Sequence, residues 1–195
     1  MPAPEDEQGT EPEDRIDIPD APDGPDGDNP GGGGEPTPDV AVTPDHDTGI
    51  YARESPYLER CVQLGVASER LINVSFPGSP GDDAEPDHPL LDRLFAYLEG
   101  ERDEFTDVDI ALTVPTEQRT VLEAVRNVPY GEDVSVERLA RMAGLDDENE
   151  ADVTTVRTAL GANPVPVVVP DHRIRDGPSS APPRVEQRLR SLEGL

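Results

Sequence analysis

Apolar residues in the first half of the chain follow patterns typical of a small α/β unit. β-Branched and other apolar residues dominate two short runs, Arg60–Val66 and Leu71–Phe76, which predict a β-hairpin. Leucine and phenylalanine recur at helical spacing within Leu90–Leu98 and stop at Gly100, so we expect a helix that packs on the hairpin. A further short strand is predicted for Asp107–Thr113, where alternate residues are apolar.

The second half carries the start signals of several helices. Thr116 is predicted to cap one helix, and Ser135 to cap a second, Val136–Met142, in which Met142 faces the core. A third helix is predicted for Asp152–Leu160. Two helices joined by a glycine-containing turn are typical of a helix-turn-helix, so this half is predicted to be a winged-helix-like domain.

The end of the chain adds two elements. The apolar run Val165–Val169 has proline at both ends and is too short for a helix, so it is predicted to be a buried strand. Apolar residues at helical spacing from Val185 to Leu192 predict a last helix. The predicted fold class is α/β, with a small N-terminal hairpin and helix domain at residues 48–112 and a C-terminal helix-turn-helix domain at residues 113–195.

Residues 1–47 consist mainly of proline, glycine, aspartate and glutamate and show no apolar periodicity. Such a segment cannot bury enough apolar surface to offset the entropy of an ordered chain. We therefore predict a disordered acidic tail. Plain solubilisation is the simpler interpretation of its role, and an unknown partner is the alternative.

The charge balance has two interpretations. The formal net charge is -27, and all 16 basic residues are arginine because the sequence contains no lysine. An acidic protein of this kind repels nucleic acid at ordinary salt. Alternatively, it comes from the cytoplasm of a halophile, where molar salt reduces the Debye length to about 3 Å and screens the carboxylates. The absence of lysine favours the halophilic interpretation, under which acidity says little against DNA binding.

Cys61 is the only cysteine, which excludes an internal disulfide and a multi-cysteine metal site. We interpret it as a packed, half-buried thiol. His46 and His88 lie beside acidic residues in predicted loops, so we interpret both as solvated surface histidines and predict no metal site. No stretch reaches the roughly 20 apolar residues that cross a bilayer, and the N-terminus has no secretory signal. We expect a cytoplasmic protein without a membrane partner.

Three short motifs occur in a defined order: Pro129-Tyr130-Gly131, Asn163-Pro164-Val165-Pro166 and Pro170-Asp171-His172-Arg173. In this order and spacing, the chain resembles the O6-alkylguanine-DNA alkyltransferase family from the first hairpin through Glu193. The resemblance implies a small α/β domain and a helix-turn-helix that enters the minor groove of double-stranded DNA, without a cofactor and as a monomer. Flipping of the damaged guanine into a pocket is required, because its alkylated oxygen cannot reach a protein nucleophile inside the base stack.

In that family, the signature is Pro-Cys-His-Arg, and the cysteine thiolate accepts the alkyl group. The resemblance assigns activation of the thiolate, through water, to the positions of His172 and Glu193, and the base pocket to Asn163. The cysteine position is Asp171. The resemblance therefore implies an alkyltransferase-like protein that senses alkylated guanine without methyl transfer and passes the site to excision-repair proteins.

Several positions depart from the family pattern. Val136 stands where the family has a tyrosine that rotates the phosphate, and Thr154 where it has an arginine that fills the space of the flipped base. Arg157 remains a candidate for contact with phosphate or a narrow minor groove. The loop at residues 177–183 is shorter and lacks the family's tyrosine. The candidate DNA-binding and base-binding residues are Asn163, Pro164, Arg173, Arg157, Thr154, Val136 and Tyr130.

Two alternatives stay open. One is a degenerate helix-turn-helix regulator or scaffold without lesion recognition. The other is a dealkylase in which Asp171 attacks the alkyl carbon and water cleaves the resulting ester, although a carboxylate is a poorer nucleophile than a thiolate. Asp171 could also pair with His172, accept hydrogen bonds from a base edge, or merely hold its loop. For Arg173 and Glu193 we favour structural roles. We interpret Arg188 and Arg190 as a solvated face.

Overall fold

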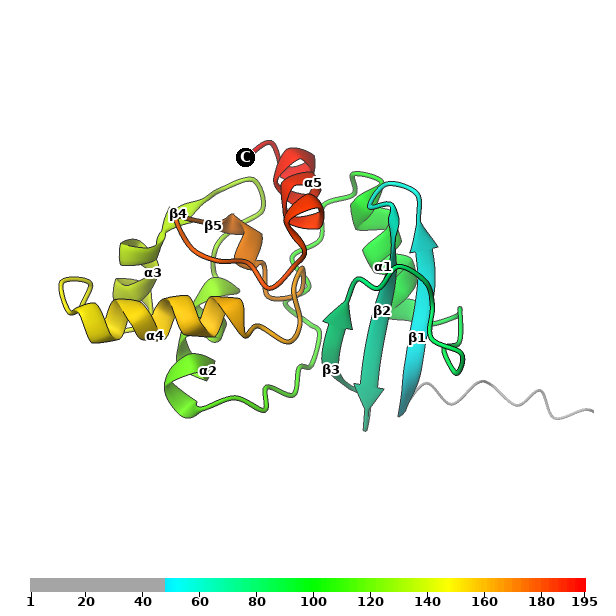
Figure 1. Ribbon diagram of the computed structural model, residues 1–195, viewed down its shortest axis with the longest axis horizontal. Helices are drawn as coiled ribbons and strands as arrows, with labels where there is room; N and C mark the ends of the chain where they lie inside the picture. Colours follow the sequence, from blue (N-terminus) through cyan, green and yellow to red (C-terminus); the bar gives the residue numbers. More distant parts are fainter. Residues whose placement is uncertain (1–47) are drawn as a thin grey trace, which may run out of the picture. The chain divides into compact units, whose positions relative to one another are not determined.

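The structure is a computed structural model, and it describes residues 48–195 (Figure 1). The predictions for the acidic tail and for His46 lie outside the described residues. The observed fold is a mixed α/β arrangement of a small sheet and helices, which confirms the predicted fold class. The division into two domains after residue 112 stays a prediction. Within residues 48–195, every helix is too short or too polar to span a lipid bilayer.

An antiparallel three-stranded sheet forms the first half, and helix α1 packs against it (Figure 1). The predicted hairpin is confirmed as β2 and β3. Strand β1 was not predicted, because its sequence TGIYARES contains few apolar residues and they do not alternate regularly with polar ones. It pairs with β2 so that Tyr51 lies opposite Leu64, and both side chains are buried in the core. The elements are β1 (Thr48–Ser55), β2 (Arg60–Ala67), β3 (Arg70–Ser75) and α1 (Pro89–Leu98).

The interpretation of His88 as a solvated histidine is wrong. Its side-chain Nδ1 accepts a hydrogen bond from the backbone N–H of Leu90 at 3.0 Å and so caps α1. The His88 ring also lies 4.5 Å, between centroids, from the Tyr51 ring. A capping acceptor satisfies one of the N–H groups that a helix start leaves unpaired, which gives this histidine a structural role.

The strand predicted at Asp107–Thr113 is wrong. Only Ile110 forms a bridge, to Leu71 at the edge of β3. The backbone N–H of Leu71 donates to the Asp109 carbonyl, and the N–H of Ala111 donates to the Leu71 carbonyl, both at 2.9 Å. The segment contacts the sheet at this bridge and then continues towards α2. The alternating apolar residues of Asp107–Thr113 therefore pack against the sheet without forming a strand.

The second half contains helices α2 to α5, a short 3-10 helix and a two-stranded parallel pair (Figure 1). Helices α2, α3 and α4 pack on one another, and the predicted helix pair and last helix are confirmed. The elements are α2 (Thr116–Val125), β4 (Val134–Ser135), α3 (Val136–Met142), α4 (Glu150–Gly161), η1 (Asp171–Arg173), β5 (Ile174–Arg175) and α5 (Pro183–Glu193).

Two of the predicted details of these helices are wrong. Thr116 is the first residue of α2 instead of its cap, because Pro115 precedes it and makes no side-chain cap bond. Met142 is 39% exposed, since α3 ends there and the side chain leaves the core. The cap at Ser135 is confirmed, because its side chain accepts from the backbone N–H of Arg138.

The run Val165–Val169 is buried as predicted, but it forms a turn instead of a strand. The backbone N–H of Val169 donates to the Val165 carbonyl at 2.9 Å. Prolines within and around the run remove N–H donors that a strand ladder needs, which explains the error. Val167 has a φ of 77°, a left-handed conformation that is strained for a β-branched residue. This tight turn places Asn163 beside the segment that begins at Asp171.

Candidate functional site

The motif Asp171-His172-Arg173 forms the short helix η1 directly after the buried turn. All three side chains are buried, and Asp171 is only 1% exposed. Buried polar and charged groups cost free energy unless they are hydrogen-bonded, so their partners decide what this site can do. Two groups of contacts result, one around Asp171 and one around Glu193.

The carboxylate of Asp171 accepts hydrogen bonds from neighbouring side chains and backbone. Asn163 Nδ2 donates to Oδ2 at 2.9 Å and also to the Val169 carbonyl. Ser179 Oγ donates to Oδ1 at 2.7 Å, while Ser180 donates to Oδ2 from its backbone N–H at 3.1 Å and its Oγ at 2.7 Å. Among the ion pairs of residues 48–195, none joins Asp171 to His172. The carboxylate therefore holds the loop that follows β5.

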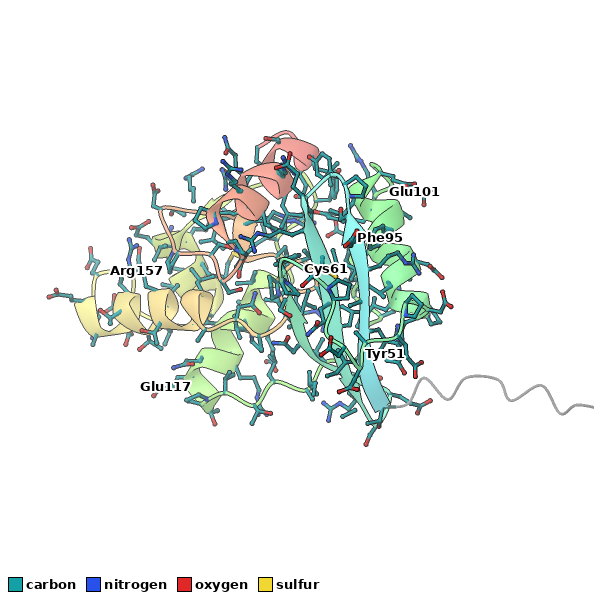
Figure 2. All side chains as sticks on the ribbon, turned by 45° about the vertical axis from the view of Figure 1, so that its right-hand side comes forward. Tyr51, Cys61, Phe95, Glu101, Glu117 and Arg157 are labelled. Atoms are coloured by element: carbon teal, nitrogen blue, oxygen red, sulfur yellow. The ribbon has the colours of Figure 1, made fainter. Side chains whose placement is uncertain are left out.

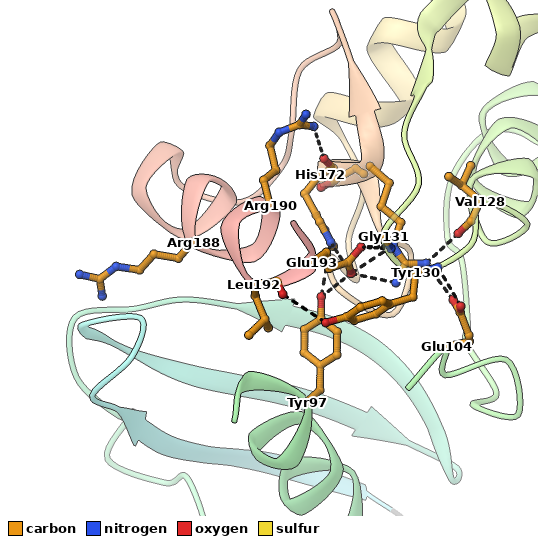
Figure 3. Close-up of polar contacts among 12 residues, drawn as sticks. Tyr97, Glu104, Val128, Tyr130, Gly131, His172, Arg188, Arg190, Leu192 and Glu193 are labelled. Atoms are coloured by element: carbon orange, nitrogen blue, oxygen red, sulfur yellow. Dashed lines mark hydrogen bonds and ion pairs between the residues drawn. The ribbon is translucent and has the colours of Figure 1, made fainter. Parts of the chain in front are cut away.

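Glu193, on α5, is the centre of the second group, and Figure 3 shows it between Tyr97 and His172. Tyr97 OH donates to Oε1 at 2.6 Å, and His172 Nε2 lies 3.1 Å from the same oxygen. Arg173 donates to both carboxylate oxygens, with Nε 2.8 Å from Oε2, and the N–H of Gly131 donates to Oε2 at 3.1 Å. Glu193 is thereby connected to the sheet half, to η1 and to the turn before β4.

These contacts set the charge state of Glu193. Burial by itself would raise its pKa, but the hydrogen bonds from His172, Arg173 and Tyr97 and the charge of His172 lower the pKa to about 2. Burial and the negative charge of Glu193 raise the pKa of Tyr97, so the phenol keeps its proton and stays a donor. The carboxylate is ionised and fully partnered at neutral pH.

Arg173 has a structural place, as the sequence interpretation favoured. Its Nη1 donates to Glu104 Oε2 at 2.8 Å and to the Val128 carbonyl at 2.7 Å, in addition to the bonds with Glu193. Burial would lower its pKa, but hydrogen bonds and attraction from Glu193 and Glu104 raise it above the ordinary value. The guanidinium therefore remains charged and ties η1 to the loop that follows α1 and to the turn that follows α2.

The two ring nitrogens of His172 differ in their contacts, because only Nε2 lies within hydrogen-bond distance of Glu193. Nδ1 is buried and has no hydrogen-bond partner among residues 48–195. The backbone carbonyl of His172 accepts from Arg190 Nη1 at 2.6 Å, and Arg190 also pairs with Asp133. The interpretation of Arg190 as part of a solvated face is therefore wrong, because its guanidinium lies over η1.

Arg188 is likewise engaged, which corrects the same interpretation. It pairs with Glu59 at 2.9 Å and donates to the Tyr57 carbonyl, while Tyr57 OH donates back to the Arg188 carbonyl at 2.9 Å. These contacts join the turn between β1 and β2 to α5. Helix α5 is thus held from the sheet half at two places, near Tyr57 and at Tyr97.

The other candidate DNA-binding residues do not gather around Asp171. Val136 is fully buried at the start of α3. Thr154 is exposed on α4 and donates its hydroxyl to the Glu150 carbonyl at 2.7 Å. Arg157 is also exposed on α4, and Nη1 donates to the Asp176 carbonyl at 2.5 Å (Figure 2). The assignment of these residues to DNA contact stays a prediction.

Pro164 and Tyr130 connect the site to the rest of the molecule. The Pro164 carbonyl accepts from the N–H of Val74 at 2.8 Å and from Asn73 Nδ2 at 3.3 Å. Tyr130 OH donates to the Leu192 carbonyl, and its ring meets the edge of the Tyr97 ring with centroids 6.0 Å apart. Both residues therefore brace the segments around η1.

Sequence reasoning missed four side chains of the site, which are Tyr97, Glu104, Ser179 and Ser180. A signal existed for Tyr97, because it lies three residues after Leu94 on the buried stripe of α1. No periodic signal identified the two serines or Glu104, which lie in loops. Their roles depend on which groups the fold brings near Asp171 and Arg173.

A groove of about 520 Å³ lies beside the Asp171 group. Asn163 and Ser180, which both donate to Asp171, belong to its lining, but Asp171 does not. Cys61 lies elsewhere, buried in β2, where its Sγ donates to the Arg53 carbonyl and burial raises the pKa of the thiol (Figure 2). The remaining lining residues are Asn73, Val74, Ser75, Phe76, Pro77, Gly161, Ala162, Pro166 and Pro182. No group of three side chains that could hold a metal ion occurs within residues 48–195.

Comparison with known proteins supports one family. A family model described as the DNA-binding domain of 6-O-methylguanine DNA methyltransferase matches residues 116–188. A methylated-DNA–protein-cysteine methyltransferase of Methanopyrus kandleri is 31% identical over 53% of this chain and 77% of its own length. An inducible one of Bacillus subtilis is 36% identical over 51% of this chain and 53% of its own length. The crystal structure of Mycobacterium tuberculosis OGT in complex with DNA is 27% identical, with a TM-score of 0.59 over 75% of this chain and 91% of that chain.

Proposed function

Because this chain belongs to the O6-methylguanine-DNA methyltransferase family, we propose that it binds double-stranded DNA and recognises alkylated guanine without accepting the alkyl group. The resemblance places Asp171 at the position of the family's acceptor cysteine. One observation carries the proposal, which is that both carboxylate oxygens of Asp171 already accept hydrogen bonds. The single cysteine, Cys61, is buried in the sheet and bonded to Arg53.

The chemistry of alkyl transfer supports the same conclusion. A nucleophile must reach the alkyl carbon in line with the departing oxygen of the base, and a thiolate does so far better than a carboxylate. Asp171 would have to give up bonds from Ser179 and Ser180 before it could attack, and each hydrogen bond to a charged acceptor contributes about 1.5 to 3 kcal/mol. The dealkylase alternative is therefore the less favoured one.

A buried network around the motif supports recognition. His172 and Arg173 both bond to Glu193, so the residues at the family's histidine, arginine and glutamate positions form one connected group. Arg157, exposed on α4, donates to a single acceptor within residues 48–195, the Asp176 carbonyl, and retains N–H donors for a phosphate. We propose that α4 enters the minor groove, and that the loss of tyrosine and arginine at Val136 and Thr154 weakens base flipping without abolishing DNA contact.

A binding titration of the full chain tests the proposal. Duplexes that differ only in one O6-methylguanine are compared in molar KCl, where the repulsion between phosphates and a chain of net charge -27 is screened. We expect tighter binding of the lesion duplex and no gain of a methyl group by the protein. Equal binding of both duplexes would favour the regulator or scaffold alternative, and a methyl group on Asp171 or catalytic turnover would favour the dealkylase.

Recognition without repair implies a further step. A protein that marks alkylated guanine but leaves it in place needs other proteins to remove it, so we propose excision-repair proteins as partners. We further propose that the protein acts as a monomer in the cytoplasm. Co-purification of a repair protein only in the presence of lesion duplex would support this partner class, and capture that does not depend on the lesion would contradict it.

A further inference from the structure

We propose that Asp171 is a latch that keeps residues 178–181 closed over the site, and that ligand reaches η1 only when this latch opens. The residues belong to the segment that joins β5 to α5 (orange, Figure 1). This inference rests on the proposed function for the nature of the ligand, alkylated guanine in DNA. The closed loop itself follows from contacts among the protein's own residues.

The hydrogen bonds to Asp171 come mostly from the loop. Of four donors to its carboxylate, three belong to Ser179 and Ser180, and the fourth is Asn163 Nδ2. Asn163 also donates to the Val169 carbonyl and lies next to the buried turn, so it does not depend on the loop. The loop is therefore connected to a fixed, negatively charged acceptor, which makes stronger hydrogen bonds than a neutral one.

Both ends of the loop are anchored without Asp171. A Cβ atom at Gly177 would lie 2.8 Å from Leu160 Cδ1 and 3.2 Å from Val136 Cγ2, so the backbone packs closely on α3 and α4 at this point. At the other end, Pro182 and Pro183 lead into α5 with a fixed φ. Between these ends, Ala181 is buried in the core, whereas Ser179 and Ser180 are held by Asp171 and can move as a short flap once these bonds break.

The groove is lined in part by this flap. Asn163 and Ser180 belong to its lining and both donate to Asp171 from their side chains, whereas Asp171 itself is 1% exposed. Residues of the groove lining therefore cover the carboxylate. Access from the groove to η1 requires the bonds of Ser179 and Ser180 to break.

Two variants should open the latch, one by removing the hydrogen-bond acceptor and the other by removing its hydroxyl donors. Asp171→Ala removes the acceptor, and the double variant Ser179→Ala with Ser180→Ala removes the hydroxyl donors but keeps Asp171. Ser191→Ala is the matched control, because its hydroxyl donates to the Gln187 carbonyl within α5 and has no contact with the loop. Because the two latch variants differ in the group that they remove, a folding defect in one leaves the other as a test.

Amide hydrogen exchange of the full chain without DNA is the first measurement. We expect the backbone N–H groups of residues 179–181 to exchange faster in both latch variants and at the unchanged rate in Ser191→Ala. The second measurement is binding to duplexes with and without O6-methylguanine. A site that is open in about one tenth of molecules binds about tenfold more weakly than a fully open one, so we expect Asp171→Ala to bind the lesion duplex up to about tenfold more tightly.

The outcomes separate the latch from the proposed function. Unchanged loop exchange in Asp171→Ala would overturn the latch. Faster exchange together with weaker lesion binding in Asp171→Ala would also overturn it, because Asp171 would then contact the ligand instead of excluding it. Faster exchange without lesion preference in any variant, the wild type included, would support the closed loop and contradict the proposed function.

Discussion

Tyr97 on α1 donates its phenol proton to Glu193 on α5, with 2.6 Å between the two oxygens. The two residues are 96 positions apart, and both side chains are buried. This contact joins the helix that packs on the sheet to the network that surrounds η1. Stability of the sheet half and geometry around His172 are consequently coupled.

Removal of the Tyr97 hydroxyl should destabilise the protein. Tyr97→Phe keeps the ring but takes one donor from a buried carboxylate, which should lower the free energy of unfolding by about 1 to 2 kcal/mol. Chemical denaturation in high salt measures the change. Tyr57→Phe is the control, since Tyr57 is 38% exposed and should cost less. An equal or larger loss in the control would contradict the role of Tyr97.

The low pKa of Glu193 predicts a pH dependence of stability. Its folded-state pKa of about 2 lies below the ordinary 4.5, so its contribution is present above pH 4.5 and is lost as pH falls towards 2. The difference corresponds to roughly 3 kcal/mol. Denaturation of wild type and Glu193→Gln between neutral pH and pH 2 should show a stability gap that narrows in acid. A stability gap that does not change with pH would exclude the ionisation of Glu193 as its source. Glu117→Gln, exposed on α2, controls for the loss of one surface carboxylate.

Restoration of sulfur at the motif position should restore acceptance of the alkyl group. Asp171→Cys places a thiol beside His172, whose Nε2 already lies 3.1 Å from Glu193. Incubation with O6-methylguanine DNA and mass spectrometry should show one methyl group per molecule of Asp171→Cys and none on wild type or Asp171→Ser. Lack of transfer to Asp171→Cys would mean that the site does not receive the flipped base in a reactive position.

Arg157 should contribute to DNA affinity without distinguishing the lesion. Arg157→Gln removes one positive charge from the exposed side of α4, so binding should weaken similarly for damaged and undamaged duplexes. The slope of log affinity against log salt should fall in magnitude by about 1. Arg119→Gln, on α2, serves as the control. Loss of affinity for the lesion duplex alone would indicate that Arg157 contacts the base.

Salt should stabilise this protein strongly. The net charge of -27 causes repulsion among carboxylates, which molar KCl screens. Thermal unfolding at increasing KCl should therefore show a midpoint that rises steadily towards molar concentration. NaCl at the same concentrations tests whether charge screening alone explains the stabilisation. If it does, NaCl and KCl should raise the unfolding midpoint equally. A midpoint that is independent of salt would contradict the halophilic interpretation.

The sequence by itself determined the elements whose signals are local. Hairpin β2–β3, helix α1, the Ser135 cap and the last helix follow from apolar periodicity and capping chemistry, which act over a few residues. The three motifs and the place of Asp171 among them were also readable, and they indicated the family. Local signals failed where proline or a single contact altered the outcome, at Val165–Val169 and at Asp107–Thr113.

Only the tertiary structure decided the partners of the site residues. The sequence placed Asp171 next to His172, but in the fold the Asp171 carboxylate bonds to Asn163, Ser179 and Ser180. The His172 ring lies against Glu193 instead. Tyr97 enters the site from a helix that carries no motif. The physical reason is that a buried charge takes whichever donors packing brings within about 3 Å, and packing depends on the whole chain at once.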